Sequence, residues 1–311
     1  MAAVATGRVI AGRRGGRVRR LRRRVTPYLF LSPFLVTFMA FVVYPLIFAA
    51  NLSLYRYQIF TRATKFVGLD NYAKALGYNA FWDGVTNVLA FGLLQVPLML
   101  GIALGAALLL DSGLLKRPSI FRLGFFLPFA VPGVVGALIW GYLYGQQWGP
   151  VAQITKAVGM TPPLFLSPGS IIPALAVIST WQWAGYNMVI IYAALKSIPL
   201  ELYEAARVDV ASGLAIARYI KIPMVAPALM LTFIFSIIGT LQLFNEPNVL
   251  RQTAPAAIGP NFTPNMYLYN TAFQIGDFYY SAALAFSLAM VTMVLVLGVL
   301  LVNAWRSRRS A

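Results

Sequence analysis

The chain has 311 residues, of which 59% are hydrophobic and only 11% are charged. Soluble domains carry roughly 45–50% apolar and about 25% charged residues, so this composition predicts an integral membrane protein. Because the sequence contains neither cysteine nor histidine, disulfides, thiolate nucleophiles, zinc clusters and histidine acid–base chemistry are excluded. We therefore expect neither an enzyme nor a bound cofactor or metal.

Nine arginines between Arg8 and Arg24 precede the first apolar segment. Together with the formal net charge of +17 they raise the question of nucleic-acid binding. Their position instead favours a basic cytoplasmic tail, 1–27, that lies against anionic membrane lipid, with no nucleic-acid partner. The apolar run from Tyr28 to Ala50 is too long for the core of a signal peptide and lacks a small-residue cleavage site near its end. We interpret it as a retained helix.

Six segments are long and apolar enough to cross a bilayer, which takes roughly 20 residues. In chain order they are Tyr28–Ala50, Val85–Leu110, Leu123–Tyr144, Ile171–Leu195, Met224–Phe244 and Ala282–Ala304. The third contains Pro128, Pro132, Gly133 and Gly136, which predict a kink or a local unwinding. The expected fold class is an all-α membrane protein with six transmembrane helices.

The placement of lysine and arginine predicts the orientation of these spans. With the N-terminus inside, 19 of the 25 basic residues fall on the cytoplasmic side and six on the outer side. Without the N-terminal tail the split is ten to six in the same direction. We expect a multi-pass protein of the cell (inner or plasma) membrane with both termini in the cytoplasm. Its transmembrane domain covers 28–305, and a basic C-terminal tail covers 306–311.

The cytoplasmic loop over 197–223 has the pattern of folded structure rather than of a linker. Pro199 suits a first helical turn, and the acids that follow it place negative charge near the positive end of the helix dipole. A second short helix, Leu214–Ile220, is expected to end at Pro223. We predict a helix–turn–helix under the membrane, with a face of small residues and one exposed acid, suited to docking onto a soluble partner.

The same loop contains Glu-Ala-Ala at 204–206, then three residues ending in Asp209, and later Ile220 and Ile222-Pro223. This spacing resembles the EAA loop of ABC importer permeases, in which the final pair is Leu-Pro. Val210 stands where that family has glycine, and Gly213 is expected to supply the turn. The likeness extends from about Tyr28 to the last span. The segments VGLDNY (67–72) and FFLPFAVPGVVGALIWGYLY (125–144) resemble the carbohydrate branch, of the maltose and glycerol-phosphate type.

The resemblance implies a sugar importer in which this permease pairs with a second homologous permease. Two cytoplasmic ATPase subunits would drive transport, and an extracytoplasmic solute-binding protein would deliver the sugar. In that family the EAA loop sits in a cleft of the ATPase, which assigns coupling to Glu204, Ala205, Ala206, Asp209, Gly213, Ile220 and Pro223. The chain has no Walker-type G-x-x-x-x-G-K-[ST] motif of its own.

Two other functions stay open at this point. One is an ABC permease for a non-sugar solute. The other is a secondary transporter acting alone, although the internal repeats and charged spans typical of such proteins are not seen.

Aromatic and amide side chains gather at membrane depth in two spans. The candidate substrate-pathway residues are Trp181, Gln182, Trp183, Tyr186 and Asn187 in the fourth span, with Gln242, Asn245 and Glu246 at the end of the fifth. Rings stack on the C–H faces of sugars, and amides form directional hydrogen bonds with hydroxyls. For any single residue, packing between helices is the competing and favoured interpretation.

Overall fold

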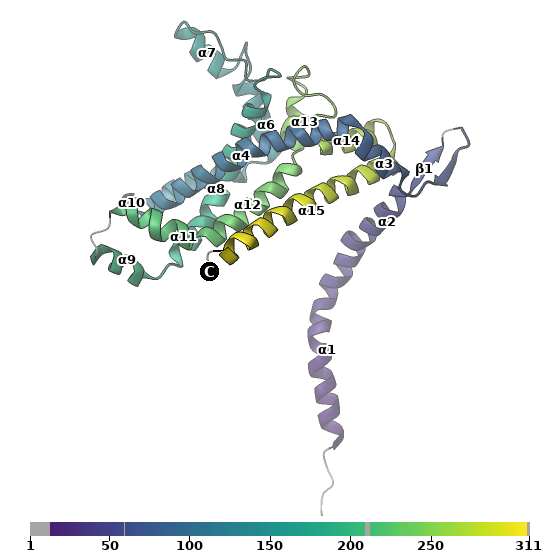
Figure 1. Ribbon diagram of the computed structural model, residues 1–311, viewed down its shortest axis with the longest axis horizontal. Coiled ribbons are helices and arrows are strands. Elements are labelled where there is room, and N and C mark those ends of the chain that lie inside the picture. Colours follow the sequence, from purple (N-terminus) through teal and green to yellow (C-terminus); the bar gives the residue numbers. More distant parts are fainter. Residues whose placement is uncertain (1–12, 59, 209–211, 310–311) are drawn as a thin grey trace, which may run out of the picture. The chain divides into compact units, whose positions relative to one another are not determined.

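The computed structural model describes residues 13–58, 60–208 and 212–309. These residues are mostly helical, with a single two-stranded hairpin among the described part of the chain (Figure 1). The chain divides into two compact units, Met1–Leu52 and Ser53–Ala311. The first unit holds α1 (Arg13–Phe38), the π-helix η1 (Met39–Val43) and nearly all of α2 (Tyr44–Ser53). Its apolar side chains are exposed, as befits a helix that faces lipid or another subunit.

The centre of the second unit is a pair of long helices, α4 (Asn79–Asp111) and α8 (Ile171–Lys196), which pack along their length. A third helix, α12 (Ala226–Leu241), packs against both. Because 14 of the 26 residues of α8 are buried, this helix is central to the unit rather than at its rim.

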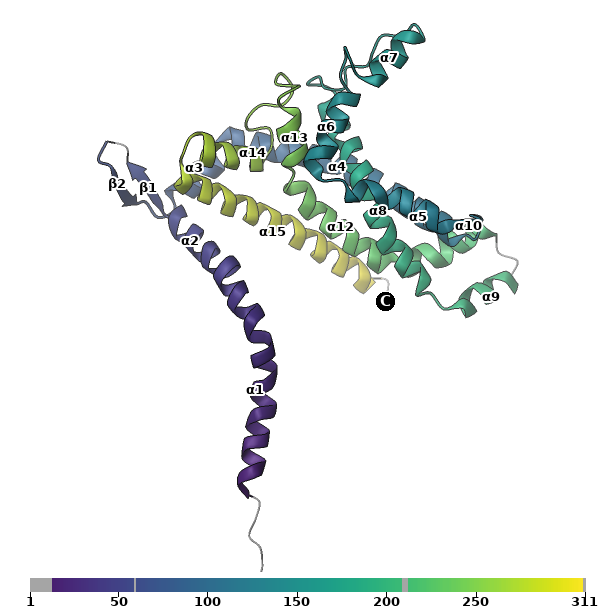
Figure 2. The ribbon, with the colours of Figure 1, turned by 180° about the vertical axis from the view of Figure 1, so that it is seen from behind.

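A broken helix covers one side of α8 (Figure 2). It consists of α5 (Pro118–Phe126), the 3₁₀ turn η2 (Leu127–Ala130) and α6 (Gly133–Leu143). The two halves are bent by 97° at a break of two residues, Val131 and Pro132. Proline has no N–H to continue the helix ladder and Val131 is extended, which accounts for the break. The kink predicted in this segment is confirmed.

The segments predicted to be outer loops contain short helices and strands that were not predicted from the sequence. They are the strands β1 (Tyr55–Gln58) and β2 (Ala63–Phe66), and the helices α3 (Asp70–Gly77), α7 (Pro150–Ala157), α13 (Asn245–Leu250), α14 (Pro264–Tyr269) and η4 (Asn270–Gln274). The strands pair antiparallel with Tyr55 opposite Phe66. The buried amide of Asn71 donates to the carbonyls of Ser53 (2.9 Å) and Tyr55 (2.7 Å), which fixes the start of the hairpin on α3. The last helix is α15 (Phe278–Arg309).

The predicted loop over 197–223 contains two helical segments. The first is α9 (Leu200–Val208). The second runs through α10 (Gly213–Ile216), the π-helix η3 (Ala217–Lys221) and α11 (Ile222–Met224). The second helix therefore does not end at Ile220. Pro223 lies in the first turn of α11, where a missing N–H breaks no hydrogen bond.

Among the described residues, four helices are long and apolar enough to cross a membrane. They are Thr26–Ser53, Asn79–Asp111, Ala226–Leu250 and Phe278–Trp305, and the bent pair α5–α6 raises the number to five if it forms one span. These ranges agree with five of the predicted spans. Helix α8 is long enough but does not qualify, because Gln182 and Asn187 and their aromatic neighbours interrupt its apolar sequence.

Candidate functional site: a polar cavity between α4, α8 and α12

A cavity of about 300 Å³ lies between α4, α8, α12 and the turn into α13. Six of the eight predicted pathway residues line it, namely Trp183, Tyr186, Asn187, Gln242, Asn245 and Glu246. The helical repeat explains the contribution of α8, because residues 183, 186 and 187 lie on one face. The cavity thus brings together predicted pathway residues from α8 and from the end of α12.

The other two candidates, Trp181 and Gln182, contact the broken helix instead. The Trp181 ring lies edge-on to Trp140 of α6, with centroids 5.9 Å apart. Gln182 Nε2 donates to the carbonyl of Val131, 3.0 Å away, inside the break. Because that carbonyl has no helical partner, Gln182 replaces a lost backbone hydrogen bond. These contacts agree with the packing interpretation for both residues.

Three aromatic rings form one side of the site. Trp183 and Tyr186 stand edge-on at 6.0 Å, and Phe129 of η2 stacks on Tyr186 at 4.8 Å. Both α8 rings keep more than a third of their surface exposed, so their faces are accessible from the cavity. Phe129 was not a candidate from the sequence, because only the break in its helix brings it to α8.

The polar lining is made of amides and hydroxyls. Besides the predicted residues it includes Gln95 of α4, Ser179 of α8, and Ser236 and Thr240 of α12. The Gln95 amide contacts the sulfur of Met99 at 3.2 Å, and both residues line the cavity. A polar residue in the middle of an apolar span was the available signal for all four.

Glu246 is the one acidic side chain among the described residues that line the cavity, and none of those residues is lysine or arginine. It is buried and lies in the first turn of α13, where the helix dipole favours a negative charge. The cavity can therefore bind hydroxyl-rich, uncharged molecules by hydrogen bonding and ring stacking. Anions would meet no compensating positive charge there.

The predicted coupling residues lie in and around α9 and the segment that begins at α10. Glu204 is exposed, whereas Ala206 is buried against the rest of the chain. Gly213 opens α10, and a Cβ there would meet no described heavy atom within 4 Å. The connection between the helices is 209–212, so Asp209 lies outside the described residues. Further along, Ile220 is partly buried and Pro223 is exposed.

Tyr203 joins α9 to the rest of the second unit. Its ring packs against an apolar cluster formed by the C-terminal ends of α4 and α8 together with Ile198 and Val225. The Lys221 ammonium lies 5.3 Å from the centre of the ring, a cation–π contact that joins α9 to η3. Burial raises the pKa of Tyr203, so its hydroxyl stays neutral.

Apolar helices packed around a polar, aromatic cavity, with a helical loop at one end, are typical of membrane permeases. The chain matches the family described as binding-protein-dependent transport system inner membrane component over residues 3–309, and it belongs to this family. It is 31% identical over 289 residues to the lactose transport system permease protein LacF of Rhizobium radiobacter, covering 92% of this chain and 95% of the relative. It is 30% identical over 280 residues to the arabinooligosaccharides transport system permease protein AraP of Bacillus subtilis, covering 88% and 87%.

A third relative is the trehalose/maltose transport system permease protein MalF of Thermococcus litoralis, 29% identical over 283 residues, with 91% and 94% covered. Among solved structures, the chain resembles one from a bacterial ABC transporter involved in the import of the acidic polysaccharide alginate. The TM-score is 0.80, with 22% identity and coverage of 94% of this chain and 99% of that one. The fold is therefore that of an ABC importer permease, and the family resemblance inferred from the sequence is confirmed.

Proposed function

We propose that this chain is the permease subunit of an ABC importer that moves a sugar across the cell membrane. The sugar is delivered by an extracytoplasmic binding protein, and ATP hydrolysis in two separate cytoplasmic subunits drives its transport. The observation that carries this proposal is the cavity of rings, amides and hydroxyls between α4, α8 and α12. Sugars are recognised by this combination of surfaces. The permeases for lactose, arabinooligosaccharides and trehalose/maltose to which the chain is similar support the same substrate class.

The charge of the cavity supports a neutral sugar. Glu246 is a buried acid, and the described lining residues include no lysine or arginine, so an acidic saccharide would find no positive charge to pair with. The alginate importer resembles this chain in fold, but the lining found here does not suit that polyanion.

The helical loop supports coupling to the ATPase subunits. Glu204 is exposed, and so are the large apolar side chains Leu200, Leu214 and Tyr219 on the same loop. Apolar side chains left uncovered on a loop in water suit a surface that another subunit covers. Because Ala206 is already covered within the chain, we propose that Glu204 and the apolar residues around it make the first contact. Ala205, Asp209, Gly213, Ile220 and Pro223 complete the proposed coupling set.

The complete topology that we propose has six spans and both termini in the cytoplasm. Helix α8, fourth in chain order, is added to the five spans named above. Helix α8 can be less apolar than the others because its neighbours in the unit enclose it. The exposed apolar faces of the remaining spans are available to lipid and to a second, homologous permease.

The proposal is tested with the full complex, made of this chain, its partner permease, the ATPase and the binding protein, in liposomes. Uptake is measured for lactose, trehalose, maltose and arabinooligosaccharides, with amino acids and phosphate as comparison solutes. We expect ATP-dependent uptake of at least one sugar and of none of the comparison solutes. Trp183→Ala should lower uptake by roughly 2- to 10-fold, the value of one aromatic contact.

Trp181→Ala is the matched control, because it removes the same ring two residues away on a face that does not line the cavity. It should leave uptake per assembled complex close to that of the unaltered protein. Uptake of a comparison solute in place of sugars, or equal effects of the two tryptophan substitutions, would contradict the proposal.

A further inference from the structure

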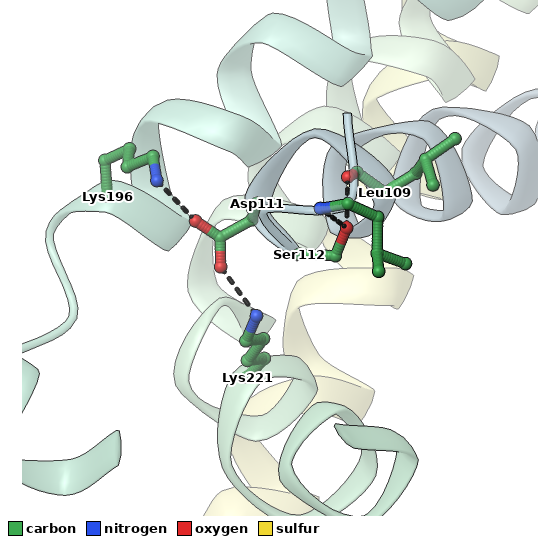
Figure 3. A network of polar contacts seen from close by, with 6 residues as sticks. Leu109, Asp111, Ser112, Lys196 and Lys221 are labelled. Carbon is green, nitrogen blue, oxygen red and sulfur yellow. Dashed lines mark hydrogen bonds and ion pairs between the residues drawn. The ribbon is translucent and has the colours of Figure 1, made fainter. Parts of the chain in front are cut away.

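Asp111, the last residue of α4, binds two lysines at once (Figure 3). Its Oδ1 lies 2.7 Å from Lys196 Nζ, and its Oδ2 lies 2.7 Å from Lys221 Nζ. We call these three residues the Asp111 clasp. Ser112 follows Asp111 and caps the end of α4, because its hydroxyl donates to the Leu109 carbonyl at 2.7 Å.

The position of Asp111 is unfavourable if α4 is considered alone. The C-terminus of a helix carries partial negative charge and prefers cations, so a carboxylate there is destabilising without a partner. The side chain of Asp111 is only 8% exposed, and that of Lys221 13%, whereas that of Lys196 is 55% exposed. The Lys221 contact is therefore shielded from solvent, and the Lys196 contact is more easily screened by salt. Asp111 is thus unfavourable for its own helix and is stabilised by lysines distant in the sequence, which indicates that it serves to hold different elements together.

The two lysines mark the ends of the cytoplasmic loop. Lys196 ends α8 directly before the loop starts, and Lys221 ends η3 close to where it finishes. Lys221 also covers the Tyr203 ring of α9. One carboxylate thus joins both ends of the loop to α4, above an apolar cluster that includes Leu110, Leu195 and Val225.

The helix that carries Asp111 also lines the cavity. Phe91, Gln95 and Met99 of α4 face the cavity, and Met99 Sδ lies 3.5 Å from Asn187 Nδ2 of α8. Met99 precedes Asp111 by twelve residues, which is about 18 Å along the helix axis. The clasp therefore lies at one end of the α4–α8 pair, and the cavity lies near the middle of the same two helices.

We propose that Asp111 is a positioning residue for energy coupling, which holds both ends of the cytoplasmic loop to α4 so that movement of the loop moves the cavity walls. The inference rests on the proposed function as an ABC permease and deepens it. The side chain of Asp111 is shielded from solvent and does not line the cavity, so it acts through Lys196 and Lys221 rather than by touching the substrate.

The decisive comparison is Asp111→Asn against Asp83→Asn in the reconstituted complex. Asp83 is exposed near the other end of α4 and forms no ion pair with the described part of the chain. Asp83→Asn therefore makes the same chemical change at a position that holds no lysine. With Asp111→Asn, the ATPase should still co-purify, while sugar transported per ATP hydrolysed falls roughly fivefold or more. Asp111→Glu, which keeps the carboxylate, should restore most of the ratio. Because Lys196 is exposed, Lys196→Gln tests the clasp with little risk to folding and should lower the ratio less.

A second measurement does not require transport. Because the chain has no cysteine, spin labels can be attached at Leu114→Cys, just after α4, and Leu214→Cys, on the loop, both highly exposed positions. Asp111→Asn should broaden the distribution of distances between them, and Asp83→Asn should not. An unchanged distribution, a coupling ratio unaffected by Asp111→Asn, or equal loss with Asp83→Asn would overturn the proposal.

Failure of the proposed function has a different signature. Glu204→Ala should reduce co-purification of the ATPase, whereas Asp111→Asn should not. If the unaltered chain neither retains an ATPase nor transports sugar, the ABC assignment of function is wrong, and the spin-label comparison still decides whether the clasp holds the loop.

Discussion

At the scale of single residues, Gly185 determines how closely α5 approaches α8. A Cβ at this position would overlap the carbonyl of Phe125 and come within 2.9 Å of the Phe126 Cα. These are backbone atoms, which cannot rotate away as a flexible side chain can. The absence of a side chain at Gly185 therefore allows the broken helix to lie against α8, and with it allows Phe129 to reach the cavity rings.

We expect Gly185→Ala to destabilise the permease by about 1–3 kcal/mol or more, because the added methyl group forces the two helices apart. Thermal unfolding of the purified complex measures the effect. Gly124→Ala is the matched control, since a Cβ at Gly124 in α5 would meet no described heavy atom within 4 Å. A similar melting temperature for both variants would show that α5 can shift without cost.

At the scale of elements, the break between η2 and α6 gives two amide residues of α8 different surroundings. Gln182 satisfies the Val131 carbonyl at the break, while Asn187, five residues later in α8, faces the cavity. Both were candidates for the substrate pathway on the same grounds, namely an amide at membrane depth. Gln182 donates to a carbonyl of the broken helix, whereas Asn187 donates within its own helix, to the Trp183 carbonyl at 3.0 Å, and lies beside the cavity.

The two amides should therefore respond differently to leucine. Gln182→Leu leaves a backbone carbonyl without its donor and should cost about 1–3 kcal/mol of stability, with little change in uptake per assembled complex. Asn187→Leu should lower uptake with a smaller change in stability. Melting temperature and uptake, measured on the same preparations, test this. If Gln182→Leu abolishes uptake in a fully stable complex, Gln182 belongs to the pathway after all.

At the scale of the whole molecule, topology is the main open prediction. Single cysteines at Trp148, at Leu214 and after Ala311 can be labelled with a membrane-impermeant maleimide, and the cysteine-free chain gives no background. Six spans with a cytoplasmic N-terminus put Trp148→Cys outside, and put Leu214→Cys and the added C-terminal cysteine inside. Labelling of the C-terminal cysteine from outside intact cells, with Trp148→Cys also outside and Leu214→Cys inside, would mean that the number of spans is odd.

The sequence by itself determined the membrane class, the approximate limits of five candidate spans, the kink near Pro132 and the family. These features depend on local properties, namely runs of apolar residues, the missing N–H of proline and the spacing of a motif. Tertiary structure decided which face of α8 meets open volume, and so separated Trp183 from Trp181. It also paired Gln182 with Val131 and Asp111 with Lys221, which lie 51 and 110 residues apart in the chain. Such pairs form only when helices pack, because no local pattern specifies which distant side chain will reach a buried carbonyl or carboxylate.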